Sequence, residues 1–343
     1  MTRRRYITLW RRAWSSPHRH TLRREVTLSG VGVHSGRYAH VKLKPTNAPR
    51  GFILNHHPLA HWRLTSSSWA TRLKLDPHVV EHASGLPVGL STPEHLLAAL
   101  YGAGIDDVEI EVTPYSNEPA PISALEDVEV PIIDGSAFPY LEVIEPTLTG
   151  DVAYQREVYP LPELHLRKGH SSLASNPNPR PGATGSLTLE LTTTLSELYP
   201  ELLRDDLTSE RRIALQTVRR ARLITSDDFA HSIAPARTFG LRAHEVQLSA
   251  RGLIRGVSSE NTLIIDHEGL ISAKLRHPDE LAAHKLLDAL GDLALSGRRW
   301  RGHLALRRGS HALNHLYLRR LNAEVARDLD STGDSGGSDE RSD

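Results

Sequence analysis

The segment HKLLDALGD, residues 284–292, places four ionisable side chains among leucines. On a helix that turns about 100° per residue, these side chains fall on one narrow stripe and the leucines form the opposite, buried face. His284 and Asp288 are separated by one helical turn, so both can reach a single point in space. Lys285 and Asp292 lie beside them. A solvated His–Asp ion pair explains such a stripe on most helices, and a metal site requires a further ligand.

His95, in the segment STPEHLLAAL (91–100), is the best candidate for that ligand. A catalytic zinc has three protein ligands and a fourth position open to water. Glu94, next to His95, could act as a base on the water, as does the glutamate of H-E-x-x-H proteases. That motif is absent from the chain. His311, at the end of a predicted strand, is another candidate, although a single histidine of this kind is more often a capping or surface residue.

These residues need helices and strands to position them, and the first half of the sequence supplies both. We expect Ser91 or Thr92 to cap a helix that ends near Gly102 and Gly104. The segment DDVEIEV (106–112) alternates as a strand does, and EVPIIDGSAFPYLEVI (129–144) predicts a strand, a turn and a short helix.

The second half mixes short strands and helices in the same way. We expect strands at 186–195, 261–266 and 302–309 and helices at 207–232, near 245, and from Ala312 onward. A turn is expected at 236–240. Because these elements lack the regular strand–helix alternation of a parallel sheet, the predicted fold class is α+β. We divide the chain into an N-terminal extension (1–21), a first α+β domain (22–148), a second α+β domain (149–325) with the ionisable helix at 280–297, and a tail (326–343).

Composition excludes several classes of protein. The 343 residues contain 41 Lys plus Arg and 41 Asp plus Glu, and only 5% are aromatic, so nothing indicates a nucleic-acid partner. The absence of cysteine excludes disulfides and thiolate sites. No apolar run is long enough to predict a transmembrane segment. The glycines of GVGVHSG (30–36) have the wrong spacing for a dinucleotide loop, and His56, His57 and His61 are interpreted as a surface insert without a carboxylate partner.

The two ends differ from the middle. Residues 1–24 hold eight arginines and no acid, which is typical of either an organelle-targeting peptide or a basic terminus. No apolar stripe in residues 1–20 predicts that this segment joins a core, so we expect its deletion to change stability and activity little. The small, acidic residues of the tail predict disorder.

Six segments, taken together and in order, resemble one enzyme family: GVGVHSG, STPEHLLAAL, EVPIIDGSAFPYL, ARTFG, AHKLLDALGD and GSHALN. The family is that of the zinc-dependent UDP-3-O-acyl-N-acetylglucosamine deacetylases of lipid A biosynthesis, and the resemblance covers about residues 22–322. It implies two similar domains, each a mixed sheet with two helices, with the helices sandwiched between the two sheets. It also implies a β-α-β insert at about 241–266 that shapes an acyl-chain passage.

The resemblance implies a role for each matching residue. His95, His284 and Asp288 would bind one Zn²⁺, or Fe²⁺ in its place, with Glu94 as general base. His311 would be the charged histidine that serves the oxyanion or the leaving amine, held protonated by Asp292. Thr238 would polarise the amide carbonyl, and the substrate would contact Lys285, His34 and Arg308. The implied partner is a UDP-linked acylated amino sugar, and we expect a soluble monomer in the bacterial cytoplasm, or in a mitochondrion or plastid if the N-terminus is a transit peptide.

Two departures from the family pattern concern the nucleotide. Arg308 stands where the family usually has a lysine, and Leu189 or Leu191 stands where an aromatic residue would stack on uracil. They leave two alternatives open: a related zinc amidohydrolase acting on another acylated amino sugar, and a non-catalytic lipid- or sugar-binding relic.

Overall fold

The computed structural model describes residues 3–65, 70–80, 86–115, 127–149, 154–179, 181 and 187–333. Short helices and strands follow one another without a regular alternation, and the sheets contain both parallel and antiparallel pairs. The predicted α+β class is therefore confirmed. The predicted division at 148 and 149 adjoins residues 150–153, which lie outside the described residues, as do residues 334–343 of the predicted tail.

The first half of the chain builds two sheets with buried inner faces. The larger, in the order β2-β3-β9-β4-β5, comprises β2 (Val26–Val31), β3 (Tyr38–Lys44), β9 (Val108–Pro114), β4 (Phe52–Leu54) and β5 (His57–Pro58). The smaller, in the order β10-β8-β7-β6, comprises β10 (Val128–Glu129), β8 (Gly89–Ser91), β7 (Arg72–Leu75) and β6 (Trp62–Thr65). A separate pair joins β1 (His20–Leu22) to β11 (Pro146–Leu148). Along β3 and β9, buried and partly exposed residues alternate, so the apolar side chains face the core.

The second half builds one larger sheet. Its order is β13-β14-β19-β15-β16, with β13 (Leu164–Lys168), β14 (Ser171–Asn176), β19 (Arg299–Arg307), β15 (Leu187–Thr193) and β16 (Arg219–Leu223), and β12 (Val158–Pro160) also pairs with β19. The predicted helical region 207–232 is wrong in part. It contains α6 (Ser209–Gln216), then β16, and then α7 (Ser226–Asp228) with the π-helix η4 (Phe229–Ile233).

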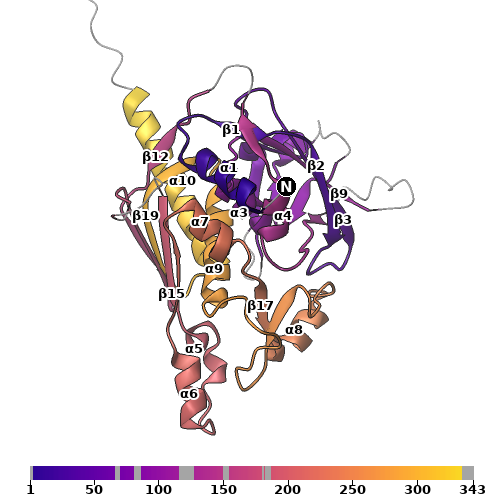
Figure 1. Ribbon diagram of the computed structural model, residues 1–343, viewed down its shortest axis with the longest axis vertical. Coiled ribbons are helices and arrows are strands. Elements are labelled where there is room, and N and C mark those ends of the chain that lie inside the picture. The colour runs from indigo at the N-terminus through magenta and orange to yellow at the C-terminus, as the bar shows by residue number, and fades with distance from the viewer. Residues whose placement is uncertain are drawn as a thin grey trace, which may run out of the picture.

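Two helices, α3 (Glu94–Gly102) and α9 (Glu280–Ala294), pack against each other in the middle of the molecule. In Figure 1 they lie between the sheet of β15 and β19 and the sheet of β2, β3 and β9. Gly291 permits this contact, because a Cβ atom at that position would lie 2.1 Å from the Glu94 carbonyl oxygen. Further helices pack on this pair, α4 (Phe138–Val143) against α3 and α10 (His311–Gly333) against α9. The similarity of two domains remains a prediction.

The predicted β-α-β insert is present. Strands β17 (Thr238–Leu241) and β18 (Thr262–Ile265) pair in parallel, and the 3-10 helix η5 (Arg242–His244) and α8 (Glu245–Ala250) connect them. Near the insert lie α5 (Leu195–Leu198), η3 (Pro200–Leu202) and α6, which form the lower end of the molecule in Figure 1. A small hydrophobic cluster, separate from the main core, joins these elements; its members are Leu195, Leu202, Leu215, Leu241, Leu263, Ile265 and Leu281. The remaining short helices are η1 (Leu59–His61) and α2 (Pro77–Val80).

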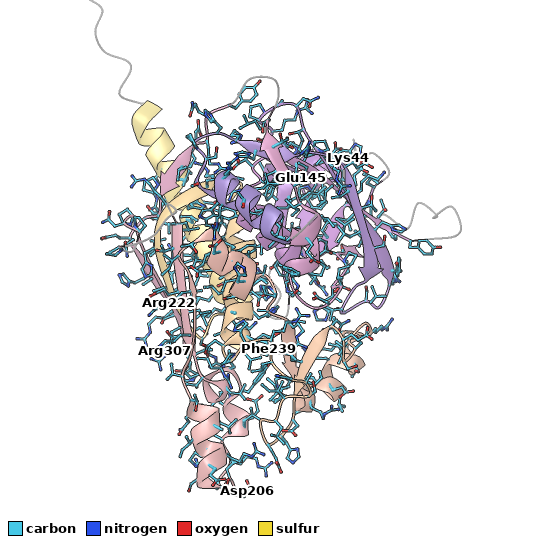
Figure 2. All side chains as sticks on the ribbon, viewed as in Figure 1. Lys44, Glu145, Asp206, Arg222, Phe239 and Arg307 are labelled. Atoms are coloured by element: carbon cyan, nitrogen blue, oxygen red, sulfur yellow. The ribbon has the colours of Figure 1, made fainter. Side chains whose placement is uncertain are left out.

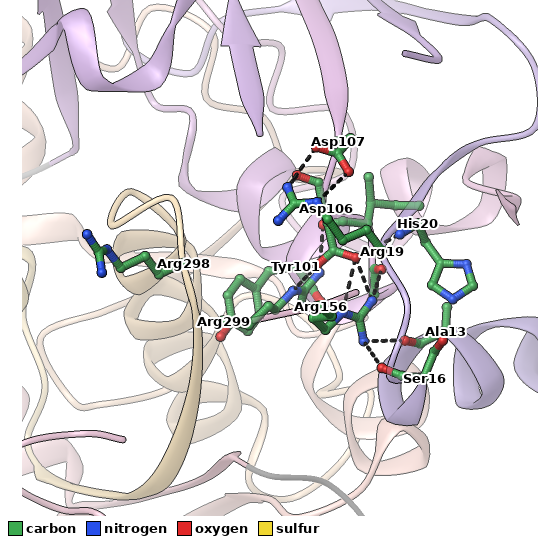
Figure 3. Close-up of polar contacts among 12 residues, drawn as sticks. Ala13, Ser16, Arg19, His20, Tyr101, Asp106, Asp107, Arg156, Arg298 and Arg299 are labelled. Atoms are coloured by element: carbon green, nitrogen blue, oxygen red, sulfur yellow. Dashed lines mark hydrogen bonds and ion pairs between the residues drawn. The ribbon is translucent and has the colours of Figure 1, made fainter. Parts of the chain in front are cut away.

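The N-terminal segment forms α1 (Arg3–Ser15), and the prediction that residues 1–20 stay outside the core is wrong. Trp10 and Ala13 are buried, and the Trp10 indole donates a hydrogen bond of 3.0 Å to the Ile144 carbonyl. At the end of α1, the Arg156 guanidinium donates to the carbonyls of Ala13 and Ser16 and pairs with Asp106, as Figure 3 shows. The helix therefore contacts both halves of the chain.

The C-terminal tail also differs from its prediction. Helix α10 continues to Gly333, so residues 326–333 are helical rather than disordered. The composition of this stretch alone hides the helix because buried apolar residues of α10, among them Leu313, Tyr317, Leu318 and Leu321, come before it. Helix α10 thus extends beyond the predicted second domain.

Candidate metal and catalytic site

Helices α3 and α9 bring His95, His284 and Asp288 together. All three side chains are buried, and their ligand atoms lie within 4.8 Å of one another. The Nε2 atoms of His95 and His284 are 3.6 and 3.4 Å from Asp288 Oδ1, and within the described residues that oxygen accepts no hydrogen bond. A buried carboxylate oxygen that faces two imidazoles is suited to coordinate a metal ion, because buried charges are normally paired or coordinated. Two imidazoles and one carboxylate fit a catalytic divalent ion such as Zn²⁺ or Fe²⁺.

The surroundings keep His284 and Asp288 in the protonation states that a metal ligand needs. Burial lowers the pKa of His284 to about 3, so the ring is neutral, and its Nδ1–H donates 3.0 Å to the Ala236 carbonyl. Burial alone would raise the pKa of Asp288, but the positive charges of Lys285 and His311 outweigh burial and hold that pKa well below its usual value. Asp288 is therefore ionised, with the Lys285 ammonium 2.9 Å from its other oxygen.

Glu94 is the first residue of α3 and is buried beside the ligand group. Its Oε1 lies 3.6 Å from His311 Nε2, and its Oε2 has no hydrogen-bond partner within the described part of the chain. Burial raises the pKa of Glu94. A carboxylate whose pKa is raised takes up a proton more readily than an ordinary one, which suits a general base.

The start of α3 is not capped in the predicted way. Pro93 is the N-cap residue, and no side chain caps the helix. Thr92 has a left-handed backbone (φ 57°), and its hydroxyl donates 2.9 Å to Glu129 instead. The same Glu129 carboxylate accepts the backbone N–H groups of His34 and Ser35, so it ties the GVGVHSG loop to the residue that precedes the helix.

His311, the first residue of α10, is paired with Asp292 across 2.9 Å. Burial alone would lower the pKa of His311, but the Asp292 and Asp288 carboxylates outweigh burial and raise that pKa to about 9. His311 is therefore a cation at neutral pH. Burial alone would likewise raise the pKa of Asp292, yet the charge and hydrogen bond of His311 hold it well below its usual range.

All but one of the sequence-predicted site residues line a single cavity of about 750 Å³; these are His34, Glu94, His95, Thr238, His284, Lys285, Asp288, Arg308 and His311. Asp292 is the exception, and it contacts the far side of the His311 ring. Thr238 is held in place by its neighbour Arg237, which forms a buried ion pair with Glu280 at the start of α9 (2.8 Å). The N–H of Thr238 itself donates 2.7 Å to the Gly135 carbonyl.

The aromatic lining of the cavity comes from outside the strand predicted to carry it. Leu189 and Leu191 are buried in the main core. Tyr199 and Phe239 line the cavity instead, with ring centroids 6.3 Å apart. Phe239, labelled in Figure 2, also packs its ring edge against His284 and lies beneath the Lys285 ammonium. No sequence pattern predicted that Tyr199 lines the cavity, because it lies beyond β15 and follows the short helix α5.

Three buried polar residues around Asp292 escaped the sequence interpretation: Thr71, Asn314 and His315. His315 carried a detectable signal, because it follows His311 by one helical turn on α10. Thr71 carried none, since it is far away in the sequence and precedes an ordinary strand.

His56 has the carboxylate neighbours that the sequence interpretation denied it. Its Nε2 lies 2.9 Å from Glu111 and 3.6 Å from Glu109, both on β9. The Lys44 ammonium already pairs with Glu111 (Figure 2 labels Lys44), and the His56 ring is half exposed. Because the Lys44 ammonium already neutralises Glu111, we assign no metal ion to the group of His56, Glu109 and Glu111.

Comparison with known proteins gives a consistent result. Residues 19–323 match the model of a family described as UDP-3-O-acyl N-acetylglycosamine deacetylase. Curated proteins named UDP-3-O-acyl-N-acetylglucosamine deacetylase are similar over nearly the whole chain. The protein of Geotalea uraniireducens is 31% identical over 88% of this chain and 87% of its own length, and that of Myxococcus xanthus is 30% identical over 90% and 87%. That of Thermodesulfovibrio yellowstonii is 28% identical over 89% and 92%. Among the described residues, we find no helix with the length and hydrophobicity needed to cross a membrane.

Proposed function

Because the chain belongs to the UDP-3-O-acyl N-acetylglycosamine deacetylase family, we propose that its cavity hydrolyses the N-acetyl group of UDP-3-O-acyl-N-acetylglucosamine, the substrate in its relatives' name. The products are acetate and the free amine, and the reaction belongs to lipid A biosynthesis. One observation carries the proposal: three ligand-type side chains, a buried carboxylate and a cationic histidine converge in one cavity. Metal-dependent amide hydrolysis uses such a set of groups.

His95, His284 and Asp288 would hold one divalent ion, Zn²⁺ or alternatively Fe²⁺. When bound, such an ion supplies a Lewis acid that polarises the amide carbonyl and lowers the pKa of water. The observation that supports this assignment is Asp288 Oδ1, which is buried without a hydrogen-bond partner in the described residues.

The remaining roles fall to groups on opposite sides of the cavity. Glu94 removes a proton from the attacking water, because it is the carboxylate nearest the ligands that is free of a strong ion pair. The cationic His311 stabilises the oxyanion that develops on the carbonyl and passes a proton to the departing amine. The Thr238 hydroxyl donates to the same oxygen. Asp292 keeps His311 charged and oriented.

Substrate binding would use the cationic rim of the cavity. Lys285 and Arg308 line it and are suited to the diphosphate, since arginine binds phosphate in two-pronged fashion. His34 lies on the loop that Glu129 fixes, and it would contact the sugar. We place the acyl chain along the insert, where Leu241, Leu248 and Ile264 contribute apolar surface.

Further proposals concern the whole protein. We propose a monomer with domains at 22–148 and 149–325, acting in the bacterial cytoplasm. The burial of Trp10 argues against removal of residues 1–21 as a transit peptide, because their loss would expose a core side chain.

Metal analysis and a deacetylase assay of the purified protein test the function together. The wild-type protein should contain about one ion per chain and release acetate from the UDP-linked substrate. His284→Ala should lose both, and Lys42→Ala, a change on the outer face of β3, should lose neither. Acetate release only from an acylated amino sugar without UDP would favour the related amidohydrolase. Metal binding without any acetate release would favour a non-catalytic relic.

A further inference from the structure

We propose that Thr71 is a positioning residue for the deacetylation reaction: its hydroxyl connects His315 to Asp292 and thereby fixes the orientation of the His311 ring. The inference rests on the proposed function, in which His311 acts on the amide. Thr71 belongs to the first half of the chain, immediately before β7, whereas the other three residues belong to α9 and α10. The residue is completely buried.

Both carboxylate oxygens of Asp292 are held by donors. The Thr71 hydroxyl donates to Oδ1, and Oδ2 accepts hydrogen bonds of 2.9 Å from His311 Nδ1 and from the Asn314 amide. The His315 Nε2 atom lies 3.0 Å from the Thr71 hydroxyl oxygen. Asp292 is therefore restrained from both sides, and only Thr71 restrains it at short range from Oδ1.

The direction of each proton in this chain of contacts follows from what each group can donate. An ionised carboxylate can only accept, so the single Thr71 proton points to Asp292. The Thr71 oxygen is then free to accept, and it is the acceptor nearest to His315 Nε2–H, at 3.0 Å against 3.4 Å for Asp292 Oδ1. The other ring nitrogen of His315 is buried and has no partner within the described residues, so a proton there would be unsatisfied. His315 is therefore the neutral Nε2–H tautomer, as its hydrogen-bond network requires.

The backbone of Thr71 makes a second connection to the site. Its carbonyl accepts a hydrogen bond of 2.8 Å from the N–H of Thr92, two residues before Glu94. One residue thus contacts the segment that places the proposed base and, through Asp292, the residue that orients the proposed acid. Thr71 is not among the residues that line the cavity, so it acts on the reaction through its contacts with Thr92, with Asp292 and with His311, whose Nδ1 lies 3.4 Å from the Thr71 hydroxyl oxygen.

Loss of the hydroxyl alone should change the rate of the chemical step rather than substrate binding. Without it, Asp292 Oδ1 loses its short-range donor and the His315 N–H loses its acceptor, so the carboxylate can rotate and the His311 ring can tilt. Removal of such supporting partners usually costs about 10–100-fold in activity. We expect a loss of that size in kcat with KM within about twofold.

Two substitutions at position 71 separate the hydroxyl from the shape of the side chain. Thr71→Val keeps the shape and lacks the hydroxyl, and it should show the full loss in kcat with unchanged metal content. Thr71→Ser keeps the hydroxyl, and its kcat should lie within about threefold of wild type. A Thr71→Val enzyme with wild-type kcat overturns the inference. So does an equal loss in both variants, because that result means a packing role.

A second pair of variants decides the question if Thr71→Val does not fold. His315→Gln retains an N–H donor near the Nε2 position, whereas His315→Leu removes it. The inference requires the larger loss of kcat in His315→Leu, and equal kcat in the two variants overturns it.

A measurement without turnover separates this inference from the proposed function. Nitrogen NMR of ¹⁵N-histidine-labelled wild-type protein should show His315 protonated at Nε2 and bare at Nδ1. The opposite tautomer overturns the inference whether or not the enzyme is active. A wild-type protein that shows the expected tautomer but releases no acetate overturns the proposed function instead.

Discussion

Asp288 and Asp292 are one helical turn apart on α9, and their neighbours differ. Asp288 faces two imidazoles and the Lys285 ammonium, and Asp292 faces His311 and uncharged donors. In the proposed function, Asp288 would therefore bind the metal and Asp292 would hold the imidazolium of His311, although both carboxylates raise the pKa of His311. At the scale of single residues, the proposed function depends on this separation and on Glu94.

Replacement of Glu94 by alanine should leave the metal in place and reduce turnover by about 10²–10⁴-fold, the usual contribution of a general base. The reason is that Glu94 is not one of the proposed metal ligands and not one of the residues proposed to bind the substrate. Metal content and kcat measured on the same sample check the prediction. Glu142→Ala, on the exposed surface of α4, is the control and should behave as wild type. Full activity without Glu94 would transfer the role of base to His311.

The dependence of the reaction rate on pH should be bell-shaped. Glu94 must be deprotonated, and burial raises its pKa, so the acidic limb should lie above the ordinary carboxyl range of about 4. His311 must be protonated, and the Asp292 and Asp288 carboxylates outweigh burial and raise its pKa to about 9, so the rate should fall as the pH rises through that value. The profile of kcat/KM against pH checks both limbs. An alkaline limb that persists in His311→Ala would assign it to another group.

The sequence allowed a candidate site residue to be predicted where its spacing on one helix or a family motif pointed to it. The stripe of His284, Asp288 and Asp292 follows from helical periodicity alone. The contribution of Thr71 does not, because its contact with Asp292 spans 221 positions and a buried hydroxyl has no sequence pattern. The capping role expected for Thr92 failed because a tertiary partner, Glu129, offered its hydroxyl a charged acceptor.

At the scale of elements, the contact between α3 and α9 sets the distance between the metal ligands. Gly291→Ala should push the two helices apart, because its Cβ would lie 2.1 Å from the Glu94 carbonyl oxygen. We expect overpacking to lower the free energy of unfolding by about 1–3 kcal/mol and to weaken metal binding. Thermal unfolding and metal titration check these effects.

Gly240→Ala is the matched control for stability, since a Cβ there meets nothing within 4 Å. Its free energy of unfolding should stay close to that of the wild type. If Gly291→Ala is equally stable and binds metal normally, the two helices do not depend on their close backbone contact.

Elements were predictable where one periodicity persisted, as in α9 and β19, whereas the β-α-β insert was expected only from the family resemblance and its first strand, β17, covers part of the turn expected at 236–240. Strand β16 was not predictable, because it is only five residues long and arginines fill its exposed positions, so the stretch reads as part of a polar helix. Its strand character comes from pairing with β15. Tertiary pairing of this kind overrides local preference.

At the scale of the whole molecule, α1 is the largest departure from the sequence prediction. It precedes the family match at residues 19–323, yet Trp10 and Ala13 join the buried interior. The sequence hides this role because the six apolar residues of α1, two of them tryptophans, are interspersed with five arginines. Helix α1 has partners in both halves of the chain, because Trp10 donates to the Ile144 carbonyl and Arg11 pairs with Asp227.

Trp10→Ala should therefore lower the free energy of unfolding by about 3–5 kcal/mol, the usual effect of truncating a buried aromatic residue. Deletion of residues 1–16 should destabilise the protein at least as much. Chemical denaturation checks both. Arg12→Ala, an exposed position on the same helix, should change stability by less than about 0.5 kcal/mol. A deletion protein as stable as the full chain would restore the interpretation of a dispensable terminus.

The separate hydrophobic cluster beneath the insert has a consequence for how the protein fluctuates. Its few leucines and one isoleucine pack β17, β18, α5 and α6 together with Leu281, at the start of α9. The rest of α9, like α3, belongs to the main core. Regions that have few buried apolar contacts of their own open locally at lower free energy than the rest of a protein. Amide protons of β18 should therefore exchange with deuterium well before those of α9. The insert could then open locally to accommodate a long acyl chain while α9, with the proposed metal ligands, keeps its structure. Equal exchange rates in β18 and α9 would show that both elements unfold as one cooperative unit.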